Sequence, residues 1–463
     1  MTSQISSHIE EKQYALQATA ALASALPPLN SALIFVALVP IRDHFHISTG
    51  LSAWLITAYF IGSAATQPVG GKLGDIWGRK RVFIIGLVYM GLASFFAAIS
   101  PSFELLLFFR INQAIAGGLI VPNAIAQLRE FGPAATRGRS FGLVAAAIGV
   151  ATGIGPVLSG LTISFWGWRS VFALSFPVIL IALILALRSM PRDKKVSNNS
   201  RLQIGSPLLM VGFFASLLLF GRFLGSEETF TITSGYQYLI FAVLCAFVFI
   251  FWERHTDNPL INMEIFDRRS GYLPGAITIL LLSICTFTSL AYIPIYIQDV
   301  LGSSERNSGF ILGIVAIFTV GFSPITGLIS DRVGRKPVVL VGASIYLVSA
   351  LMGNGLTDTT AWPFLILMMC FWGMGQVCVS APTEAAAMES LPPRLAGAAA
   401  GMYPTMRYVG AIIGTTFLAA CLGSSGFSDL VRLHALTAFL TIAAIGCLVA
   451  ASRLQGRDKK TQS

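Results

Sequence analysis

The sequence predicts an all-α integral membrane protein with fourteen transmembrane helices, arranged as two parallel six-helix halves plus an inserted helix pair. Three observations lead to this prediction. The chain is too apolar and too poor in charge for water, apolar stretches of membrane-spanning length follow one another along it, and one polar loop motif occurs twice.

Composition excludes a soluble protein. The 463 residues are 55% hydrophobic and 11% charged, whereas a soluble domain has roughly 25% charged residues. The net charge of +10 could indicate a nucleic-acid partner, but the basic residues form short runs between apolar stretches, which is typical of membrane topology. The cysteines are scattered without metal-ligand spacing, so the sequence predicts no disulfide framework, metal or cofactor.

The predicted elements begin after a polar segment, residues 1–16. This segment has no basic region leading to a cleavage site, so we interpret it as a retained cytoplasmic tail. Each later apolar stretch has about 18 to 25 residues, enough to cross about 30 Å of hydrocarbon as a helix. The fourteen stretches are 17–41, 51–70, 82–99, 103–125, 141–163, 168–187, 205–221, 236–252, 272–298, 308–330, 337–353, 362–388, 396–421 and 433–452.

Basic residues test this map, because cytoplasmic loops retain Lys and Arg. With the N-terminus inside, 24 of the 31 basic residues lie in predicted cytoplasmic segments, and Arg110 and Arg407 lie well inside spans, away from their ends. A missed span would scramble the alternation. The sequence therefore predicts a multi-pass protein of the cell (cytoplasmic or inner) membrane with both termini in the cytoplasm.

A repeated loop motif defines the domain organisation. GKLGDIWGRK at 71–80 and GLISDRVGRK at 327–336 share five residues at one constant offset. Parallel repeats are one of the known transporter architectures. We expect a tail (1–16), an N-terminal six-helix half (17–187), a cytoplasmic linker (188–204), an inserted helix pair (205–252), a cytoplasmic loop (253–270), a C-terminal six-helix half (271–452) and a cytoplasmic tail (453–463).

The motif has a physical logic as a conformational latch. Its glycines allow close helix approach, and its aspartate can accept hydrogen bonds from a helix N-terminus or pair with the following arginine. The alternative is that the basic residues are only positive-inside anchors, but the repeat favours the latch. Its predicted members are Gly71, Asp75, Gly78, Arg79, Asp331, Gly334 and Arg335.

From about residue 20 to 452 the chain resembles the major facilitator superfamily, in its fourteen-span drug:proton antiporter branch. The resemblance rests on WLITAYFIGSAATQPVGGKLGDIWGRKR, LLLFFRINQAIAGG, GVATGIGPVLSG, WGWRSVFALSFP, FWERHTDNPLINMEIF and PIYIQDVLGSS. It implies alternating access, efflux driven by inward proton flow, and a part for Arg110 in proton coupling. The glycine-proline motif, which is typical of exporters, predicts a helix break at Gly155 and Pro156.

One intramembrane position departs from the pattern of the branch, and a few charged residues lie within spans. The branch usually has an aspartate in the first span where this chain has Asn30, and asparagine cannot titrate. Glu384 is then the best candidate for a proton carrier, unless it lies close enough to the cytoplasmic end to be solvated. Arg407 is its natural opposite charge. Arg110 is a functional candidate because an intramembrane charge is costly; the alternative is an arginine that snorkels to the interface.

The sequence predicts a proton-coupled exporter of hydrophobic or amphipathic organic compounds, acting as a monomer on a small organic substrate and protons, with lipid but no nucleic acid as partner. The alternatives are an exporter or facilitator for one neutral or anionic metabolite, and a non-transporting membrane sensor. An enzyme is not expected, because HExxH and GxSxG motifs are absent, and GxxxxGK[ST] is absent too. The predicted cavity residues are Asn30, Tyr59, Gln113, Tyr292, Gln376 and Arg407.

Overall fold

The computed structural model describes residues 2–131, 137–191, 193, 205–224, 232–256, 263–266, 271–391, 396–423 and 429–454. These residues form helices joined by short turns, without a β-strand among them. Most of the predicted linker 188–204 and of the C-terminal tail 453–463 lies outside the described residues, as do parts of the predicted loop 253–270.

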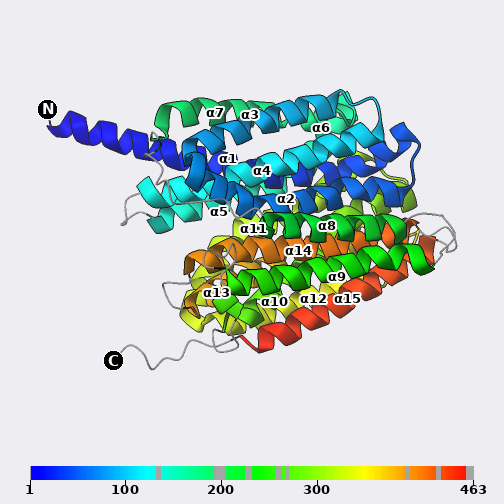
Figure 1. Cartoon of the computed structure of the whole chain (residues 1–463). Coiled ribbons are helices and arrows are strands. Elements are labelled where there is room, and N and C mark those ends of the chain that lie inside the picture. The colour runs from blue at the N-terminus through cyan, green and yellow to red at the C-terminus, as the bar shows by residue number, and fades with distance from the viewer. Residues whose placement is uncertain are drawn as a thin grey trace.

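Seven helices precede the predicted linker and pack together as the N-terminal bundle (Figure 1). In this bundle α1 packs on α5 and α7, and α4 packs on α2 and α3. The short α6 and α7 together occupy one predicted span. The helices are α1 (Thr2–Phe45), α2 (Thr49–Trp77), α3 (Arg79–Ala98), α4 (Phe103–Phe131), α5 (Arg137–Trp166), α6 (Ser170–Ala173) and α7 (Ser175–Ser189).

The C-terminal bundle follows the inserted pair. Its main contacts join α12 to α13, α10 to α14 and α11 to α13. The inserted pair is α8 (Gly205–Leu224) and α9 (Ile232–His255), followed by the 3-10 turn η2 (Met263–Phe266). The bundle comprises α10 (Tyr272–Ile295), the π-helical turn η4 (Tyr296–Val300), α11 (Glu305–Val333), α12 (Arg335–Gly353), α13 (Trp362–Glu389), α14 (Ala396–Gly423) and α15 (Asp429–Ser452).

A helical segment occupies each of the fourteen predicted stretches, but only twelve described helices are long and apolar enough to cross a membrane. Length and hydropathy therefore support twelve of the fourteen predicted spans among the described residues. The exceptions are α2 and α8. In α2 the reason is its position: it is rich in Gly, Ser and Thr and lies between α4, α14 and α8, so it needs little lipid-facing apolar surface.

The two copies of the loop motif have the same backbone geometry. Gly78, between α2 and α3, has φ of 98°, and Gly334, between α11 and α12, has φ of 103°. Side chains with a Cβ rarely adopt such values, so glycine is required in both turns. The repeated sequence thus encodes a repeated helix–turn–helix.

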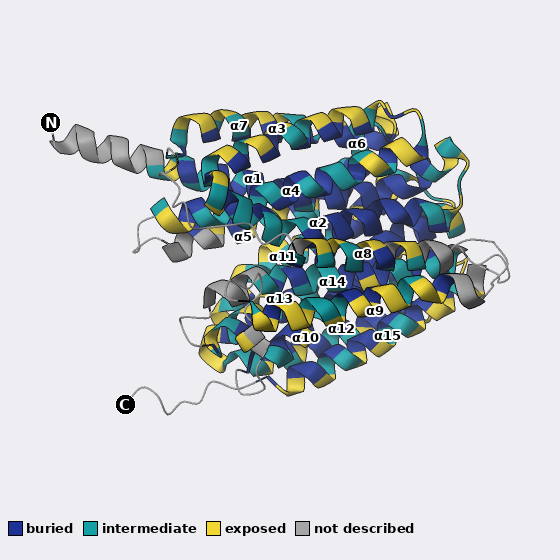
Figure 2. Cartoon of the chain, viewed as in Figure 1, coloured by how far each residue is buried: buried dark blue, intermediate teal, exposed yellow. Residues whose placement is uncertain are grey.

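We call the end of the molecule at which α1 begins and α15 ends the terminal end, and the opposite end the distal end. Both of these chain ends lie at the left in Figure 1. Buried residues of α2 run almost without interruption from Gly50 to Ala65 in its distal part, whereas only Gly70 and Gly74 are buried beyond them (Figure 2). The bundles therefore enclose α2 more completely toward the distal end.

Candidate functional site

The bundles meet first along α5 and α11, whose distal parts touch almost backbone to backbone. A Cβ added at Gly153 would lie 2.5 Å from the Cβ of Ala316, and one at Gly309 would lie 2.6 Å from the carbonyl oxygen of Pro156. A Cβ at Gly160 would lie 2.6 Å from the carbonyl oxygen of Glu305. Since real Cβ atoms are excluded from such distances, only glycine permits this approach.

The predicted helix break at Gly155 and Pro156 does not end the helix, and a kink at this point stays a prediction. The α5 helix continues without interruption from Arg137 to Trp166. Its small residues are also contact points, because a Cβ at Gly155 would lie 2.5 Å from the Cβ of Ala32 in α1. Proline removes one N–H donor, but neighbouring helices support a membrane helix through that position.

A second contact joins α2 to α14. The hydroxyl of Thr57 donates a hydrogen bond of 2.9 Å to the hydroxyl oxygen of Thr415, and both residues are buried. Nearer the distal end, Ala53, Trp54 and Ala419 form a small apolar cluster. This side of the interface is closed by ordinary packing plus one polar pair.

An ion pair crosses between the bundles at the distal surface. The guanidinium of Arg42, at the end of α1, donates to both carboxylate oxygens of Asp299 in η4, with a distance of 2.9 Å from Nη2 to Oδ1. Its Nε donates to Asp43 at 2.8 Å and its Nη1 to Thr49 at 3.1 Å. The sequence did not reveal this pair, because nothing local indicates that two positions so far apart in the chain meet.

The terminal-most contacts of this interface are aromatic. Phe60 of α2 packs on Phe287 of α10 with ring centroids 4.7 Å apart and on Tyr408 of α14 at 5.9 Å. The side-chain amide of Gln67 donates to the Tyr408 hydroxyl at 3.2 Å. Within the described part of the chain, the hydrogen bonds, ion pair and ring contacts that join the bundles all lie between this layer and the distal end.

Arg110 is buried inside the N-terminal bundle, with an exposed fraction of 1%. Its Nη1 donates to Gln113 at 2.8 Å and to the carbonyl of Asn30 at 3.4 Å, and its guanidinium lies 4.3 Å from the centroid of the Tyr59 ring. Gln113 in turn donates to Ser94 at 2.8 Å. No carboxylate among the described residues pairs with Arg110, and its Nη2 has no hydrogen-bond partner there. This arginine does not snorkel.

Asn30 and Tyr59, two predicted cavity residues, face the interior of the N-terminal bundle. The Oδ1 of Asn30 accepts a hydrogen bond of 2.6 Å from Ser175, and its Nδ2 lies 3.6 Å from the sulfur of Met90. The Tyr59 hydroxyl donates to the carbonyl of Pro27 at 2.9 Å. Both side chains therefore surround Arg110 and do not line the space between the bundles.

Glu384 and Arg407 lie on neighbouring helices, α13 and α14, terminal to the aromatic layer. The charge of Arg407 acts on the Glu384 carboxylate, and Tyr272 and Tyr403 are also within its electrostatic reach. Glu384 is exposed and Arg407 half-buried. Glu384 lies near the terminal end of α13, so its exposure fits the solvated position that the sequence left open as an alternative to a buried proton carrier.

The predicted latch residues pair within their own bundles. Arg79 contacts Asp75 at 3.0 Å and Glu130, at the end of α4, at 3.6 Å. In the second copy Arg335 contacts Asp331 at 3.3 Å and Glu389, at the end of α13, at 2.5 Å. Each motif therefore ties three helix ends of one bundle together. Asp193 adds a cap that the sequence did not indicate, accepting from the backbone N–H groups of Lys80 and Arg81.

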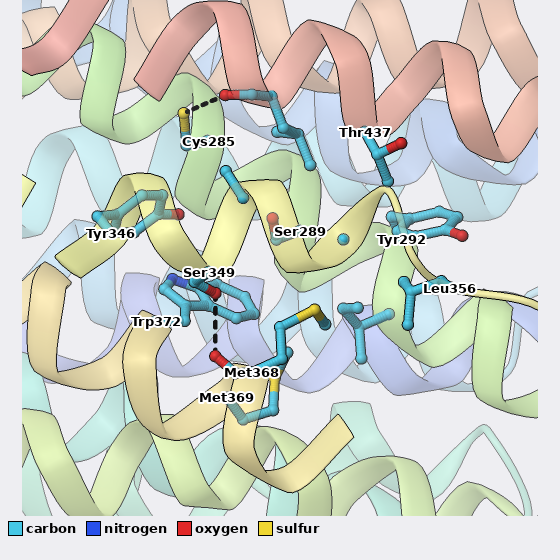
Figure 3. A pocket seen from close by; sticks show the side chains of 14 residues that line it. Cys285, Ser289, Tyr292, Tyr346, Ser349, Leu356, Met368, Met369, Trp372 and Thr437 are labelled. Carbon is cyan, nitrogen blue, oxygen red and sulfur yellow. Dashed lines mark hydrogen bonds between the residues drawn. The ribbon is translucent and has the colours of Figure 1, made fainter. Parts of the chain in front are cut away.

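Tyr292 lines a small internal cavity of the C-terminal bundle (Figure 3). The cavity lies between α10, α12, α13 and α15, and Trp372 and Met368 also form its wall. Its volume of about 30 Å³ could hold about two water molecules, so it is too small for an organic substrate. Gln376, one turn beyond Trp372 on α13, has a buried side-chain oxygen without a hydrogen-bond partner among the described residues.

Comparisons with known proteins identify the family that has this arrangement of helices. The family model described as Major Facilitator Superfamily matches residues 20–415. The chain is 31% identical over 415 residues to a multidrug resistance protein B homolog of Mycobacterium tuberculosis, covering 87% of this chain and 74% of the relative. It is 25% identical over 402 residues to the riboflavin transporter RibZ of Clostridioides difficile, covering 86% and 85%.

Solved structures show the same fold at low sequence identity. A POT family transporter in complex with a thioalcohol-conjugated peptide has a TM-score of 0.71 and 14% identity, covering 94% of each chain. The xylose transporter XylE of E. coli in its inward open conformation has a TM-score of 0.65 and 15% identity, covering 96% of this chain and 97% of that one. The chain belongs to the Major Facilitator Superfamily: it is a multi-pass membrane transporter and not an enzyme.

Proposed function

We propose that this transporter is a proton-coupled exporter of hydrophobic or amphipathic organic compounds, and that it spans the cell membrane fourteen times. The observation that carries the proposal is the position of Glu384 and Arg407. The charge of Arg407 acts on the Glu384 carboxylate, and Arg407 directly precedes Tyr408, a member of the aromatic layer that joins the bundles. A substrate and a titratable carboxyl group can therefore meet there.

The orientation follows from charge. The loops at the terminal end carry Arg79, Lys80, Arg335 and Lys336, and basic loops remain in the cytoplasm. The terminal end is then cytoplasmic, both chain termini are inside, and the state described here is inward-facing. Relatives from Bacillus subtilis and Mycobacterium tuberculosis support a bacterial cell membrane.

Alternating access gives the coupling a physical form. When the bundles rock to the outward-facing state, Glu384 takes a proton from the external solution and loses its attraction to Arg407. On return to the inward-facing state, Glu384 is exposed toward the terminal end and releases that proton to the cytoplasm. Inward proton movement thereby drives the rocking cycle. Asn30 cannot carry a proton, which leaves Glu384 as the carrier.

Arg110 has a supporting part in this scheme. Its buried charge is held by Gln113 and by backbone carbonyls, and its guanidinium covers the ring of Tyr59. The next residue after Tyr59 is Phe60, the centre of the aromatic layer. Arg110 thus rigidifies the segment of α2 against which the C-terminal bundle moves.

A second candidate function is export or facilitated passage of one neutral or anionic metabolite. The observation in its favour is the positive charge of Arg407, which acts on Glu384, the one acid for which such an effect is found among the described residues. Such a site would repel an organic cation. Riboflavin, named for one relative at 25% identity, is a suitable neutral probe.

The test is transport into sealed proteoliposomes under an imposed pH gradient, with ethidium as the cationic probe and riboflavin as the neutral one. We expect gradient-stimulated flux of one probe, and a loss of at least about tenfold in Glu384→Gln. The exposed Glu104→Gln, an identical chemical change at the distal end of α4, serves as the matched control and should transport normally. Flux that ignores the gradient would refute proton coupling, and normal flux in Glu384→Gln would refute the carrier assignment.

A further inference from the structure

The inserted helix pair packs unevenly on the two bundles. The first helix, α8, contacts α2 of the N-terminal bundle and α14 of the C-terminal bundle. Figure 1 shows it running along the boundary between the two bundles. The second helix, α9, packs mainly on α8. One inserted helix therefore bridges the lateral seam formed by α2 and α14.

One face of α8 belongs to the core of the transporter. Met210 is buried in the main apolar cluster, and Phe213 and Leu217 pack against it, a spacing that places all three on one side of the helix. Leu208 and Val211 are exposed and face away from the cluster. The helix thus presents a packed face to the seam and a free apolar face to lipid.

The two inserted helices are joined to each other by specific contacts. The hydroxyl of Ser206 donates to the carboxylate of Glu253, and both residues are buried. A Cβ added at Gly212 would lie 3.2 Å from the sulfur of Cys245, so the helices are close. The outer side of α9, with Ile240 and Phe247, is exposed and apolar. The pair behaves as one unit anchored in lipid.

The opposite lateral seam, between α5 and α11, differs in two ways. Its distal part is closed by the glycine contacts at Gly153, Gly160 and Gly309, but nothing lies within 4 Å of a Cβ added at Gly149 or Gly321, nearer the terminal end. The central helix α1 touches both α5 and α11, yet no described helix bridges this seam from the lipid side as α8 bridges the other. This seam is uncovered in its terminal part.

We propose that α8 is a lateral seal, which closes one of the two seams of the inward-facing transporter. Amphipathic molecules dissolved in the inner leaflet then reach the site through the uncovered seam between α5 and α11. Opening at α2 and α14 would require α8 to lose the contacts of Met210, Phe213 and Leu217, whereas opening at α5 and α11 exposes only small and apolar groups to lipid tails. The direction of entry rests on the orientation proposed above.

Two labelling positions at similar depths in the membrane, one at each seam, test whether α8 is a seal. At 1.5 Å per residue, Gln67 in α2 and Gly149 in α5 lie roughly 15 Å and 18 Å from the terminal ends of their helices. Phe213 and Leu217 of α8 fall at the same depth. In a variant in which the six cysteines are replaced by alanine, a single cysteine at position 67 or 149 is labelled with bimane. The protein is then placed in phosphatidylcholine vesicles that contain lipid carrying a doxyl quencher at mid-chain.

We expect the label at position 149 to be quenched at least about threefold more strongly than the label at position 67. Phe213→Ala with Leu217→Ala should raise quenching at position 67 toward that at 149 and leave position 149 unchanged. Val211→Ala with Leu219→Ala, on the lipid side of α8, is the matched control and should change neither label. The single substitution Leu217→Ala, which removes less packing, should give a smaller increase at position 67.

Equal quenching at the two positions, or quenching at position 67 that ignores the Phe213 and Leu217 substitutions, would overturn the seal. The measurement needs neither a known substrate nor a pH gradient. If proton-driven transport fails while the quenching pattern appears, the seal stands without the proposed function. If transport succeeds and the quenching pattern is absent, the proposed function stands without the seal.

Discussion

The two ends of the interface between the bundles are held in different ways. At the distal end the contacts cross from one bundle to the other: the ion pair of Arg42 with Asp299, the hydroxyl pair of Thr57 with Thr415, and the glycine contacts of α5 with α11. At the terminal end the charged residues pair within each bundle, as Arg79 does with Asp75. The difference teaches that the repeated motif stiffens each bundle, while unrepeated residues hold the bundles together.

This contrast is what a rocking transporter requires. A rigid bundle transmits motion from one end to the other, and the state that it adopts depends on which end carries the contacts between bundles. The distal contacts are individually modest, so their sum can be offset by a substrate or a proton. Substitutions that remove one class of contact at a time test this requirement.

The largest effect should come from Gly309→Val. The new Cβ would meet the carbonyl oxygen of Pro156 at 2.6 Å, so α5 and α11 must separate. Overpacking of this kind costs about 1 to 3 kcal/mol. We expect transport to fall by at least about tenfold and the thermal unfolding temperature to decrease. Gly149→Ala, where nothing lies within 4 Å of the Cβ, should change neither measurement; an unaffected Gly309→Val protein would show that the close contact is dispensable.

A smaller effect is expected from the hydroxyl pair of Thr57 with Thr415 in the buried part of the interface. Thr57→Val removes the hydroxyl that donates to Thr415, and a typical hydrogen bond contributes about 1 kcal/mol. Thr415→Val should have a similar effect, and the double variant should cost less than the two single changes added together. Chemical denaturation of all four proteins measures this coupling, and strict additivity would contradict a working bond.

The distal ion pair should contribute less, because both partners remain partly solvated. Side chains of Arg42 and Asp299 are 19% and 29% exposed, and pairs of this kind contribute about 0.2 to 1 kcal/mol. We expect Asp299→Asn to increase labelling of a cysteine at position 57 by an external, membrane-impermeant maleimide about two- to fivefold. Asp43→Asn removes a carboxylate that contacts the same arginine within one bundle, and should leave labelling unchanged. A reversal of this order would mean that the crossing pair does not hold the distal end closed.

The smallest change in stability should follow Asp75→Asn. The pair with Arg79 lies across the turn at Gly78 and is more exposed than the distal pair, so it contributes at the low end of about 0.2 to 1 kcal/mol. Arg79 also retains Glu130. If the motif also acts as the predicted cytoplasmic latch, transport should slow by more than this loss explains. Comparing the unfolding free energy with the transport rate, with Asp331→Asn beside it, separates the two roles; unchanged transport in both variants would reject the latch.

Much of the local structure could be predicted because it depends on neighbouring residues. Apolar stretches placed the helices, and the repeated glycine of the loop motif required the same turn at Gly78 and Gly334. The pairing of Asp75 with Arg79 was one of two alternatives, and the turn at Gly78 between α2 and α3 brings the two side chains together. Hydropathy failed for α2, because a helix enclosed by other helices needs little apolar surface.

The functional site was predicted less completely. Glu384 and Arg407 were singled out as rare charges within spans; the charge of Arg407 acts on Glu384, and their roles in transport stay predictions. Asn30 was expected in a cavity, but its side chain bonds to Ser175 and lies near Met90 inside one bundle. No pattern of one helix indicates which way a polar residue faces when every face of that helix is covered.

The sequence by itself determined that this protein is a helical membrane transporter with a repeated loop and few intramembrane charges, since composition, periodicity and turn chemistry are local properties of the chain. Only the tertiary structure decided which residues hold the bundles together and what the inserted pair covers. The ion pair of Arg42 with Asp299 joins positions more than half the chain apart. In the sequence α8 lies between α2 and α14 and far from both, yet it packs on both. Such contacts depend on how the helices pack, which local preferences do not specify.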